Sequence, residues 1–247
     1  MSTSKRIFAV SDIHGHYTLL KNALDEAGFD ESCEDHLLVC CGDLFDRGRE
    51  NRKVYDFIRR LQRKKIVRGN HDERLYEILT QKKANAYDLY NGTDVTLEEF
   101  FGAESIGRYG EMHLPRGRMA SNLCRFIRET VDYYETEHYV FVHGWVPIKH
   151  EEKTARVLEN WRDAGYGAWY SARFSEWPSL YGTPAFIEGK TIVCGHWHTS
   201  FGHNRYEGKG TYRGDNDDLS PFYADGIIAL DGCTVRSNHV NCIVIED

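Results

Sequence analysis

Five short apolar runs in this sequence each end in residues that can bind a metal ion. The five junctions are Val10-Ser11-Asp12-Ile13-His14, Cys41-Gly42-Asp43, Arg68-Gly69-Asn70-His71, Val142-His143-Gly144 and Cys194-Gly195-His196-Trp197-His198. Short runs rich in β-branched residues are typical of buried strands. In open α/β sheets, ligands bind beyond the carboxyl ends of such strands. We therefore expect these carboxylate, imidazole and amide groups to gather at one place, where they need a partner because burying them unpaired is costly.

The residue types favour a centre with two divalent metal ions. Asp, His and Asn donors together suit Mn²⁺, which we expect first, or Fe or Zn²⁺, better than Ca²⁺ or Mg²⁺. One carboxylate can bridge two ions about 3.5–4 Å apart, an arrangement used for in-line displacement at phosphorus. A single motif of this kind would more often be an ordinary turn. Five in succession, each after a strand, are a strong indication of a metal centre.

Alternating strands and helices must position these groups. Residues 5–80 read as strand–helix–strand–helix–strand–helix, which indicates a mostly parallel sheet, with helices over about 18–27, 50–63 and 73–81. Residues 82–137 lose the strand signal, apart from a helix-like stretch near 123–131. We interpret this segment as an insertion that caps the site.

The second half of the chain adds further strands around an aromatic segment. Residues 161–181 are rich in Trp, Tyr and Phe, which we assign to packing, and residues 203–225 read as a polar loop. The last two apolar runs look like a closing strand pair. The predicted strands of this half are 139–142, 191–194, 227–230 and 242–245. Without internal repeats or low-complexity linkers, residues 1–247 are expected to form a single domain.

Composition narrows the class of protein. The 247 residues carry a formal net charge of −7, which argues against a nucleic-acid partner. The basic cluster in residues 47–65 reads as a solvated helix face. No apolar stretch is long enough to span a bilayer, so we expect no membrane partner and a cytoplasmic location. Seven cysteines without a C-x-x-C pair fit a reducing compartment. The sequence leaves the oligomeric state open.

The five junctions resemble a known family. The series D-x-H-G, G-D-x-x-D-R-G, G-N-H-D, H-G and G-H-x-H is similar to that of the calcineurin-like metallophosphoesterases. The second motif, at residues 42–48, marks their phosphoprotein phosphatase branch, which includes compact bacterial and phage-type serine/threonine phosphatases and symmetrical diadenosine tetraphosphatases. The match is close over residues 7–72 and sparse over 139–232. The resemblance implies an α/β sandwich of two mixed β-sheets flanked by helices.

The resemblance also implies roles for individual residues. Asp43 would bridge the two ions, and His71 would be the general acid, held by Asp46. Arg47 would bind the phosphate oxygens. A second phosphate-binding arginine is expected upstream of the last motif, with Arg173 as the candidate and Arg162 as its rival; His16 is a possible rim contact. The first metal would be bound by Asp12, His14 and Asp43, and the second by Asp43, Asn70, His143 and His196.

Three residues depart from the family pattern. Ser11 stands where the phosphatase branch usually has Gly, a change that we expect to be tolerated. Asp72 replaces the usual Glu and has a side chain one methylene shorter. His198 is generally absent from the phosphatase branch, whereas the wider superfamily uses it on the first metal. We predict that His198 is a ligand, with a structural histidine as the alternative.

Two other motifs are rejected on physical grounds. Cys41 and Arg47 have the C-x₅-R spacing of cysteine-dependent phosphatases, but the intervening loop contains Asp43 and Asp46. These carboxylates would repel a phosphate and raise the pKa of the thiol. The segment 189–191 resembles the end of a phosphate-binding loop, but it precedes a strand instead of a helix. A metal-activated water, rather than a cysteine, is therefore the expected nucleophile.

The sequence thus predicts a hydrolase of phosphomonoesters, with phosphoserine or phosphothreonine in a protein, or a small phosphoester, as the substrate. A hydrolase of dinucleoside polyphosphates such as diadenosine tetraphosphate is the first alternative. A metal-binding scaffold without activity is a remote alternative. A protein that had lost catalysis would be expected to lack a metal ligand, His71 or Arg47, and all of these residues are present.

Overall fold

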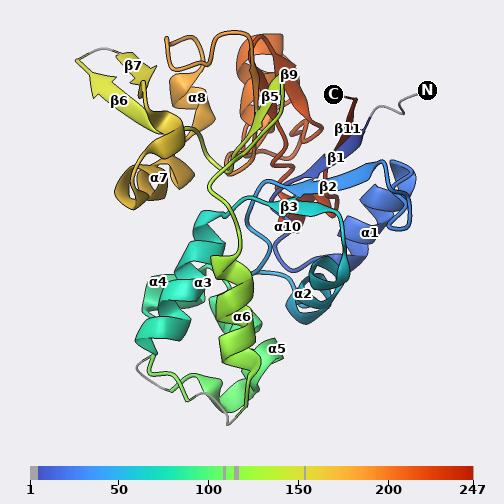
Figure 1. Cartoon of the computed structure of the whole chain (residues 1–247), viewed down its shortest axis with the longest axis vertical. Helices are drawn as coiled ribbons and strands as arrows, with labels where there is room; N and C mark the ends of the chain where they lie inside the picture. Colours follow the sequence, from blue (N-terminus) through green and yellow to red (C-terminus); the bar gives the residue numbers. More distant parts are fainter. Residues whose placement is uncertain (1–4, 108–109, 114–116, 153, 247) are drawn as a thin grey trace.

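Two β-sheets pack face to face in the computed structural model, which describes residues 5–107, 110–113, 117–152 and 154–246 (Figure 1). The strand order is β11-β1-β2-β3 in the first sheet and β4-β5-β8-β10-β9 in the second. Helices lie on the outer sides of both sheets, and both chain ends lie on the same side of the molecule (Figure 1). This is the predicted sandwich of two mixed sheets.

The first sheet contains the strands of the first three motifs. Its strands are β1 (Arg6–Val10), β2 (His36–Cys40), β3 (Lys64–Ile66) and β11 (Cys242–Glu246). β1, β2 and β3 are parallel, and β11 is antiparallel to β1. Because parallel strands end at the same edge, the chain leaves β1, β2 and β3 on one side of the sheet, as the sequence predicted.

The second sheet contains the strands of the last two motifs. Its strands are β4 (Tyr134–Glu135), β5 (Tyr139–Phe141), β8 (Thr191–Cys194), β9 (Phe222–Ala224) and β10 (Ile227–Ala229). β5, β8 and β10 are parallel, with β4 and β9 antiparallel at the edges. A separate antiparallel two-stranded sheet is formed by β6 (Ile148–Glu151) and β7 (Thr154–Val157).

The two sheets bury a shared apolar layer. This layer contains Ala9 and Val39 from the first sheet and Phe141, Val193 and Ile228 from the second. Strands that are covered on both faces need apolar residues on both, which explains why the strands appear in the sequence as unbroken apolar runs. The layer holds the ends of the two sets of strands in a fixed relation to each other.

Helices cover the outer faces. The longer ones are α1 (Tyr17–Glu26), α2 (Asn51–Arg60), α3 (Asn70–Gln81), α5 (Thr93–Phe101), α6 (Met119–Arg128) and α7 (Tyr166–Arg173). The shorter ones are α4 (Ala86–Tyr90), α8 (Trp177–Leu180), α9 (Ser200–Gly202), α10 (Thr234–Ser237), η1 (Ala103–Ser105), η2 (Trp161–Asp163) and η3 (His203–Glu207). The buried apolar cluster on the outer face of the first sheet includes residues of α1, α2, α3, α5 and α6, and that of the second sheet includes residues of α7 and α8.

The structure corrects two predictions about these elements. The last two apolar runs are strands but not a pair, because β10 lies between β8 and β9 whereas β11 pairs with β1. A short apolar run carries no record of its partner, which is decided by packing of the whole chain. The third helix begins at Asn70 instead of residue 73, so three motif residues, Asn70, His71 and Asp72, lie in its first turn. Within 82–137, the structure describes α4, α5, η1, α6 and β4.

Candidate active site and metal centre

Four of the predicted ligands lie in left-handed backbone conformations. Asp12, His14, Asp43 and His196 have φ values of 52°, 46°, 55° and 66°. The loops that carry the first three are joined, because the Asp12 N–H donates to Gly42 O and the His14 N–H donates to Asp43 O. Residues with a β-carbon adopt such conformations only where the surroundings impose them, and these residues tend to cluster at functional sites.

Two motif glycines allow these loops to approach each other. A β-carbon on Gly69 would overlap the Asp43 carboxylate, and one on Gly195 would overlap the side chains of Ser11 and Asp12. Ser11 itself fits, because its hydroxyl donates to Asp12 Oδ2 at 2.6 Å. The close spacing of the motif loops therefore requires glycine at both positions.

Asp43 is common to two clusters of potential metal donors. The first consists of His14, Asp43 and His71, and the second of Asp43, His143 and His196. Within each cluster the donor atoms all lie within 4.8 Å of one another. A carboxylate shared by two such clusters has the position required to bridge two ions. His71, expected as a general acid, lies within the first cluster.

Hydrogen bonds orient two of the imidazoles toward Asp43. His14 Nδ1 lies 3.0 Å from Phe45 O, and His143 Nδ1 lies 2.8 Å from Cys41 O. A backbone carbonyl at Nδ1 fixes the proton there, so that Nε2 is available as a ligand. The two Nε2 atoms lie 3.7 Å and 3.4 Å from the Asp43 carboxylate.

The remaining predicted ligands surround these clusters. Asn70 Oδ1 lies 2.8 Å from His143 Nε2, so both converge on the same point. Asp12 Oδ1 lies 4.0 Å from His14 Nε2, and Asp12 Oδ2 accepts from the His196 N–H at 3.0 Å. The structure therefore brings together six of the seven predicted ligands in direct contact or within 4.8 Å of a neighbour.

The charges of the site fit a metal centre. Burial alone would raise the pKa of Asp43, but His143 and His71 more than offset it and hold this pKa well below its usual range. Burial would lower the pKa of His143, but the Asp43 carboxylate raises it to about 9. A proton on His143 thus balances the buried carboxylate. A divalent cation between the same donors would replace that proton, because metal ligands must be deprotonated.

His71 and Asp46 form a buried pair beside the clusters. His71 Nδ1 lies 2.8 Å from Asp46 Oδ2, and the other ring nitrogen lies 3.1 Å from the Arg47 guanidinium. Asp46 also accepts from the hydroxyls of Thr93 and Thr96, which belong to the insertion. Three hydrogen bonds therefore fix the carboxylate that orients His71, and the Asp46 backbone N–H is held as well, because it donates to Thr96 Oγ1 and Asn51 Oδ1.

A cavity of about 260 Å³ lies over the two clusters. Arg47 and His71 line it, as do Tyr87 and Asn91 of the insertion. The predicted ligands in its lining are Asp12, His14, Asp43, Asn70, His196 and His198. The insertion thus forms part of the wall next to the predicted catalytic residues.

The structure does not bring the predicted second arginine to this cavity. Arg173 is buried, and its guanidinium pairs with Glu73 at 3.1 Å and with Asp132. It lines a different cavity, of about 700 Å³. The rival, Arg162, pairs with Glu135. Partners far away in the sequence therefore hold both side chains, and sequence spacing could not reveal this.

Two charged residues of the cavity were not predicted from the sequence. Arg213 lines it from the segment that was predicted to be a polar loop. Asp231 also lines it, and lies two residues after the end of β10. The signal for Asp231 was present, because the apolar run 227–230 ends in Asp231-Gly232 just as the other five runs end in ligand residues. The sequence held no comparable signal for Arg213.

The structure shows the contacts of His198 and Asp72, two residues that depart from the family pattern. The His198 Nε2 atom lies 4.0 Å from the Asp231 carboxylate, and His198 is not part of either donor cluster. The shorter Asp72 side chain still reaches the backbone N–H groups of Asp43, Leu44 and Gly69, at 2.9, 3.1 and 3.0 Å. Beginning the helix at Asn70 brings Asp72 close enough to do this.

Cys41 lies in the core and not at the cavity. It is fully buried in the layer between the sheets, and burial raises the pKa of its thiol well above the usual value. A thiol with a raised pKa is a poor nucleophile, since the thiolate is the reactive form. This agrees with the rejection of the cysteine mechanism.

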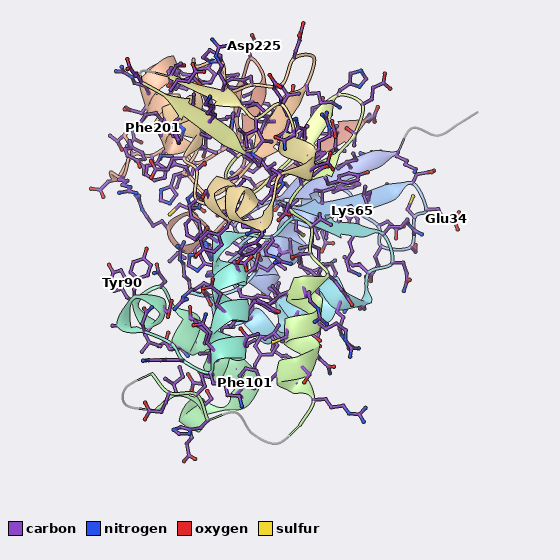
Figure 2. All side chains as sticks on the ribbon, turned by 60° about the vertical axis from the view of Figure 1, so that its left-hand side comes forward. Glu34, Lys65, Tyr90, Phe101, Phe201 and Asp225 are labelled. Carbon is purple, nitrogen blue, oxygen red and sulfur yellow. The ribbon has the colours of Figure 1, made fainter. Side chains whose placement is uncertain are left out.

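A second cavity, of about 520 Å³, adjoins the first and has aromatic walls. It shares Asn70, His71 and His196 with the first cavity. Its aromatic residues are Tyr87, Tyr170, Phe174 and Trp197. Figure 2 shows Tyr90 of the insertion and Phe201 of α9 on the same side of the molecule, one on each of the two parts from which these walls come.

The sequence as a whole confirms the family. It matches the model of calcineurin-like phosphoesterases over residues 5–200, so the chain belongs to this family. The matched region includes all five motifs. No helix of the described ranges is long and apolar enough to cross a membrane.

Curated relatives include two kinds of phosphoesterase. The chain is 33% identical over 99 residues to the asymmetrical bis(5'-nucleosyl)-tetraphosphatase PrpE of Bacillus velezensis, covering 36% of this chain and 39% of that protein. It is 31% identical over 106 residues to serine/threonine-protein phosphatase 1 of Salmonella typhimurium, covering 41% of this chain and 47% of that protein. Each match spans less than half of the relative's length.

Solved structures share the fold at low sequence identity. A cold-active protein-tyrosine phosphatase of a psychrophilic Shewanella has a TM-score of 0.54 at 15% identity, covering 99% of this chain and 76% of that one. A serine/threonine phosphatase of Saccharomyces cerevisiae has a TM-score of 0.53 at 10% identity, covering 100% of this chain and 81% of that one. These similarities support the fold alone.

Proposed function

We propose that this protein is a metal-dependent hydrolase that releases phosphate from phosphomonoesters, including phosphoserine and phosphothreonine in proteins. The observation that carries the proposal is the position of Asp43, which is shared by two donor clusters and lies next to the His71–Asp46 pair. A centre for two metals beside an oriented imidazole has the parts that displacement at phosphorus requires.

In this proposal the two ions are Mn²⁺, with Fe or Zn²⁺ as alternatives. When bound, they would supply a Lewis acid for the phosphoryl oxygens and an activated water. The proposed ligands are Asp12, His14, Asp43, Asn70, His143, His196 and His198. The insertion 82–137 caps the site, and we treat the chain as one domain because residues from 12–91 and from 196–231 meet at the cavity.

The remaining residues act on the phosphate and on the leaving group. Arg47 is exposed at the cavity, where its guanidinium would bind two phosphoryl oxygens. Although burial would lower the pKa of His71, Asp43 and Asp46 raise it above its usual value. This favours a protonated imidazole, which can donate its proton to the departing oxygen.

A hydrolase of dinucleoside polyphosphates is the second candidate, and the aromatic cavity favours it. Tyr87 is 73% exposed and Phe174 is 44% exposed. Exposed aromatic side chains beside a phosphate site can stack on a nucleobase, at about 1–3 kcal/mol per base. Relatives named as tetraphosphatases support the same candidate.

A direct comparison of substrates tests the proposal. The Mn²⁺-loaded protein is assayed on a phosphoserine or phosphothreonine peptide and on diadenosine tetraphosphate, with a chelator-treated sample as the control. We expect activity to require metal and kcat/KM to be higher for the phosphopeptide. A tenfold preference for the tetraphosphate, about 1.4 kcal/mol of differential transition-state binding, would overturn the phosphatase assignment in favour of the second candidate.

A further inference from the structure

Arg213 is an arginine at the metal cavity without a carboxylate partner. It is exposed and lines the same cavity as Asp12, His14 and Asp43. No carboxylate of the described residues forms an ion pair with it. By contrast, Arg173 and Arg162 are both paired with carboxylates and lie outside the cavity. The charge of Arg213 is therefore available to an anion.

Two aromatic rings hold the side chain in position. The guanidinium carbon of Arg213 lies 5.3 Å from the ring centres of both Trp197 and Tyr212. The two rings are stacked, 6.3 Å apart with an angle of 26° between their planes. Stacking restrains a guanidinium through its faces, and the N–H groups that are not bonded to the Tyr212 side chain can donate to an anion. Trp197 directly follows His196, so this arrangement links Arg213 to the strand end that carries a proposed ligand.

Arg47 and Arg213 reach the cavity from different walls. Arg47 follows β2, and its N–H donates to Gly92 O of the insertion at 3.4 Å. Arg213 belongs to the segment after β8 and lies against Trp197. Two guanidinium groups from separate walls can bind different oxygens of one phosphoryl group, with charge-assisted hydrogen bonds from each.

The balance of charge in the cavity favours an anion there. The carboxylates in its lining are Asp12, Asp43 and Asp231. Two divalent cations held by these donors would more than neutralise the three carboxylates, so Arg47 and Arg213 would make the cavity net positive. A phosphate dianion is the complementary ligand, and a cationic group is not.

We propose that Arg213 is the second phosphate-binding residue of this site and that it contacts the phosphoryl group that is transferred. The position expected from the sequence, Arg173, instead has a structural role in an ion-pair network with Glu73 and Asp132. The proposal rests on the proposed function, because it takes the bound anion to be the phosphoryl group of the substrate.

Binding of inorganic phosphate tests this assignment without turnover. The Mn²⁺-loaded wild type and the variants Arg213→Ala, Arg213→Lys and Arg162→Gln are titrated with phosphate by calorimetry, and the inhibition constant for phosphate is measured in parallel. We expect Arg213→Ala to weaken phosphate binding about tenfold or more, because charge-assisted hydrogen bonds are stronger than those between neutral groups. Arg213→Lys should lie in between, because it keeps the charge but loses the planar fork.

Control measurements separate a loss of phosphate binding from a loss of folding or of metal binding, and they test the role of Arg213 separately from the proposed function. Arg162→Gln removes an arginine outside the cavity and should leave phosphate binding unchanged. Metal content and the unfolding midpoint should be the same in all variants, since Arg213 is exposed. Unchanged phosphate affinity in Arg213→Ala would overturn the proposal. This holds even if the variant hydrolyses diadenosine tetraphosphate more slowly than the wild type. If the wild type binds phosphate but hydrolyses no phosphomonoester, the proposed function fails while the binding test of Arg213 still stands.

Discussion

The floor of the cavity and its rim are built in different ways. On the floor, the motif loops are buried and bonded to one another, with Asp72 alone accepting three backbone N–H groups. On the rim, Tyr87 and Phe174 are 73% and 44% exposed. The insertion takes part in both, because its buried Thr93 and Thr96 hold Asp46 while Tyr87 points away from the core.

This difference separates the chemistry from the choice of substrate. Metal ligands and a general acid act only in a narrow geometry, which a network of buried hydrogen bonds maintains. The side chains of a substrate can be accommodated by exposed residues on loops and short helices, which tolerate change. Substitutions of the proposed metal ligands on the floor should therefore remove activity on every substrate, whereas substitutions on the rim should change the preference among substrates.

The largest effect is expected at Asp43. Asp43→Asn removes the negative charge shared by both donor clusters, so we expect activity to be lost and both metals to bind more weakly. Elemental analysis of the purified variant measures metal content independently of activity. Two metals bound as tightly as in the wild type would remove Asp43 from the bridging role.

His71 should affect one kind of substrate more than another. Because the alkoxide of an alkyl phosphate needs a proton, His71→Asn should slow its hydrolysis by about 10²–10⁴. p-Nitrophenyl phosphate has a leaving group that needs no proton and should be affected much less. Steady-state kinetics on both substrates give the comparison, and equal losses would show that His71 has another role.

The pH profile of Asp46→Asn complements this test. Asp46 raises the pKa of His71, so removing its charge should lower that pKa. The protonated acid is then lost at lower pH, and the basic limb of kcat against pH should move to lower values on alkyl substrates. A profile that does not move would mean that another group titrates in this limb.

A smaller effect is expected on the rim. If Tyr87 stacks on a nucleobase, Tyr87→Ala should raise KM for diadenosine tetraphosphate about fivefold or more, since a stacked base contributes about 1–3 kcal/mol. KM for a small phosphomonoester should change less than about twofold. Tyr90→Ala is the matched control, because Tyr90 is 87% exposed on the same helix but lines neither cavity. Equal changes in both variants would indicate that α4 as a whole, and not the ring of Tyr87, matters.

The smallest effect is expected at Cys41. Cys41→Ser changes a buried core residue, so it should cost about 1–2 kcal/mol of stability and leave most of the activity intact. Thermal unfolding and kcat are measured on the metal-loaded variant. A folded, metal-binding Cys41→Ser protein without activity would revive the cysteine mechanism.

The predicted elements agree with the structure where the signal is local in the sequence. The strands β1, β2, β5 and β8 and the residues that follow them were predicted, because an apolar run and the polar residue after it are adjacent in the chain. The start of α3 was placed too late, because Asn70 and His71 look like loop residues although they form the first turn of a helix. Pairing of β10 with β11 was wrong, because both are short and apolar and carry no register signal.

The sequence by itself determined which residues can serve as metal donors and at which strand ends they lie. It also determined the family, since the spacing within each motif is local. Only the tertiary structure decided which arginines reach the cavity. Arg173 is held by Asp132, 41 residues away, and by Glu73, whereas Arg213 rests on Trp197. Such partners meet only when distant segments pack together, so a guanidinium's role depends on contacts that no local pattern records.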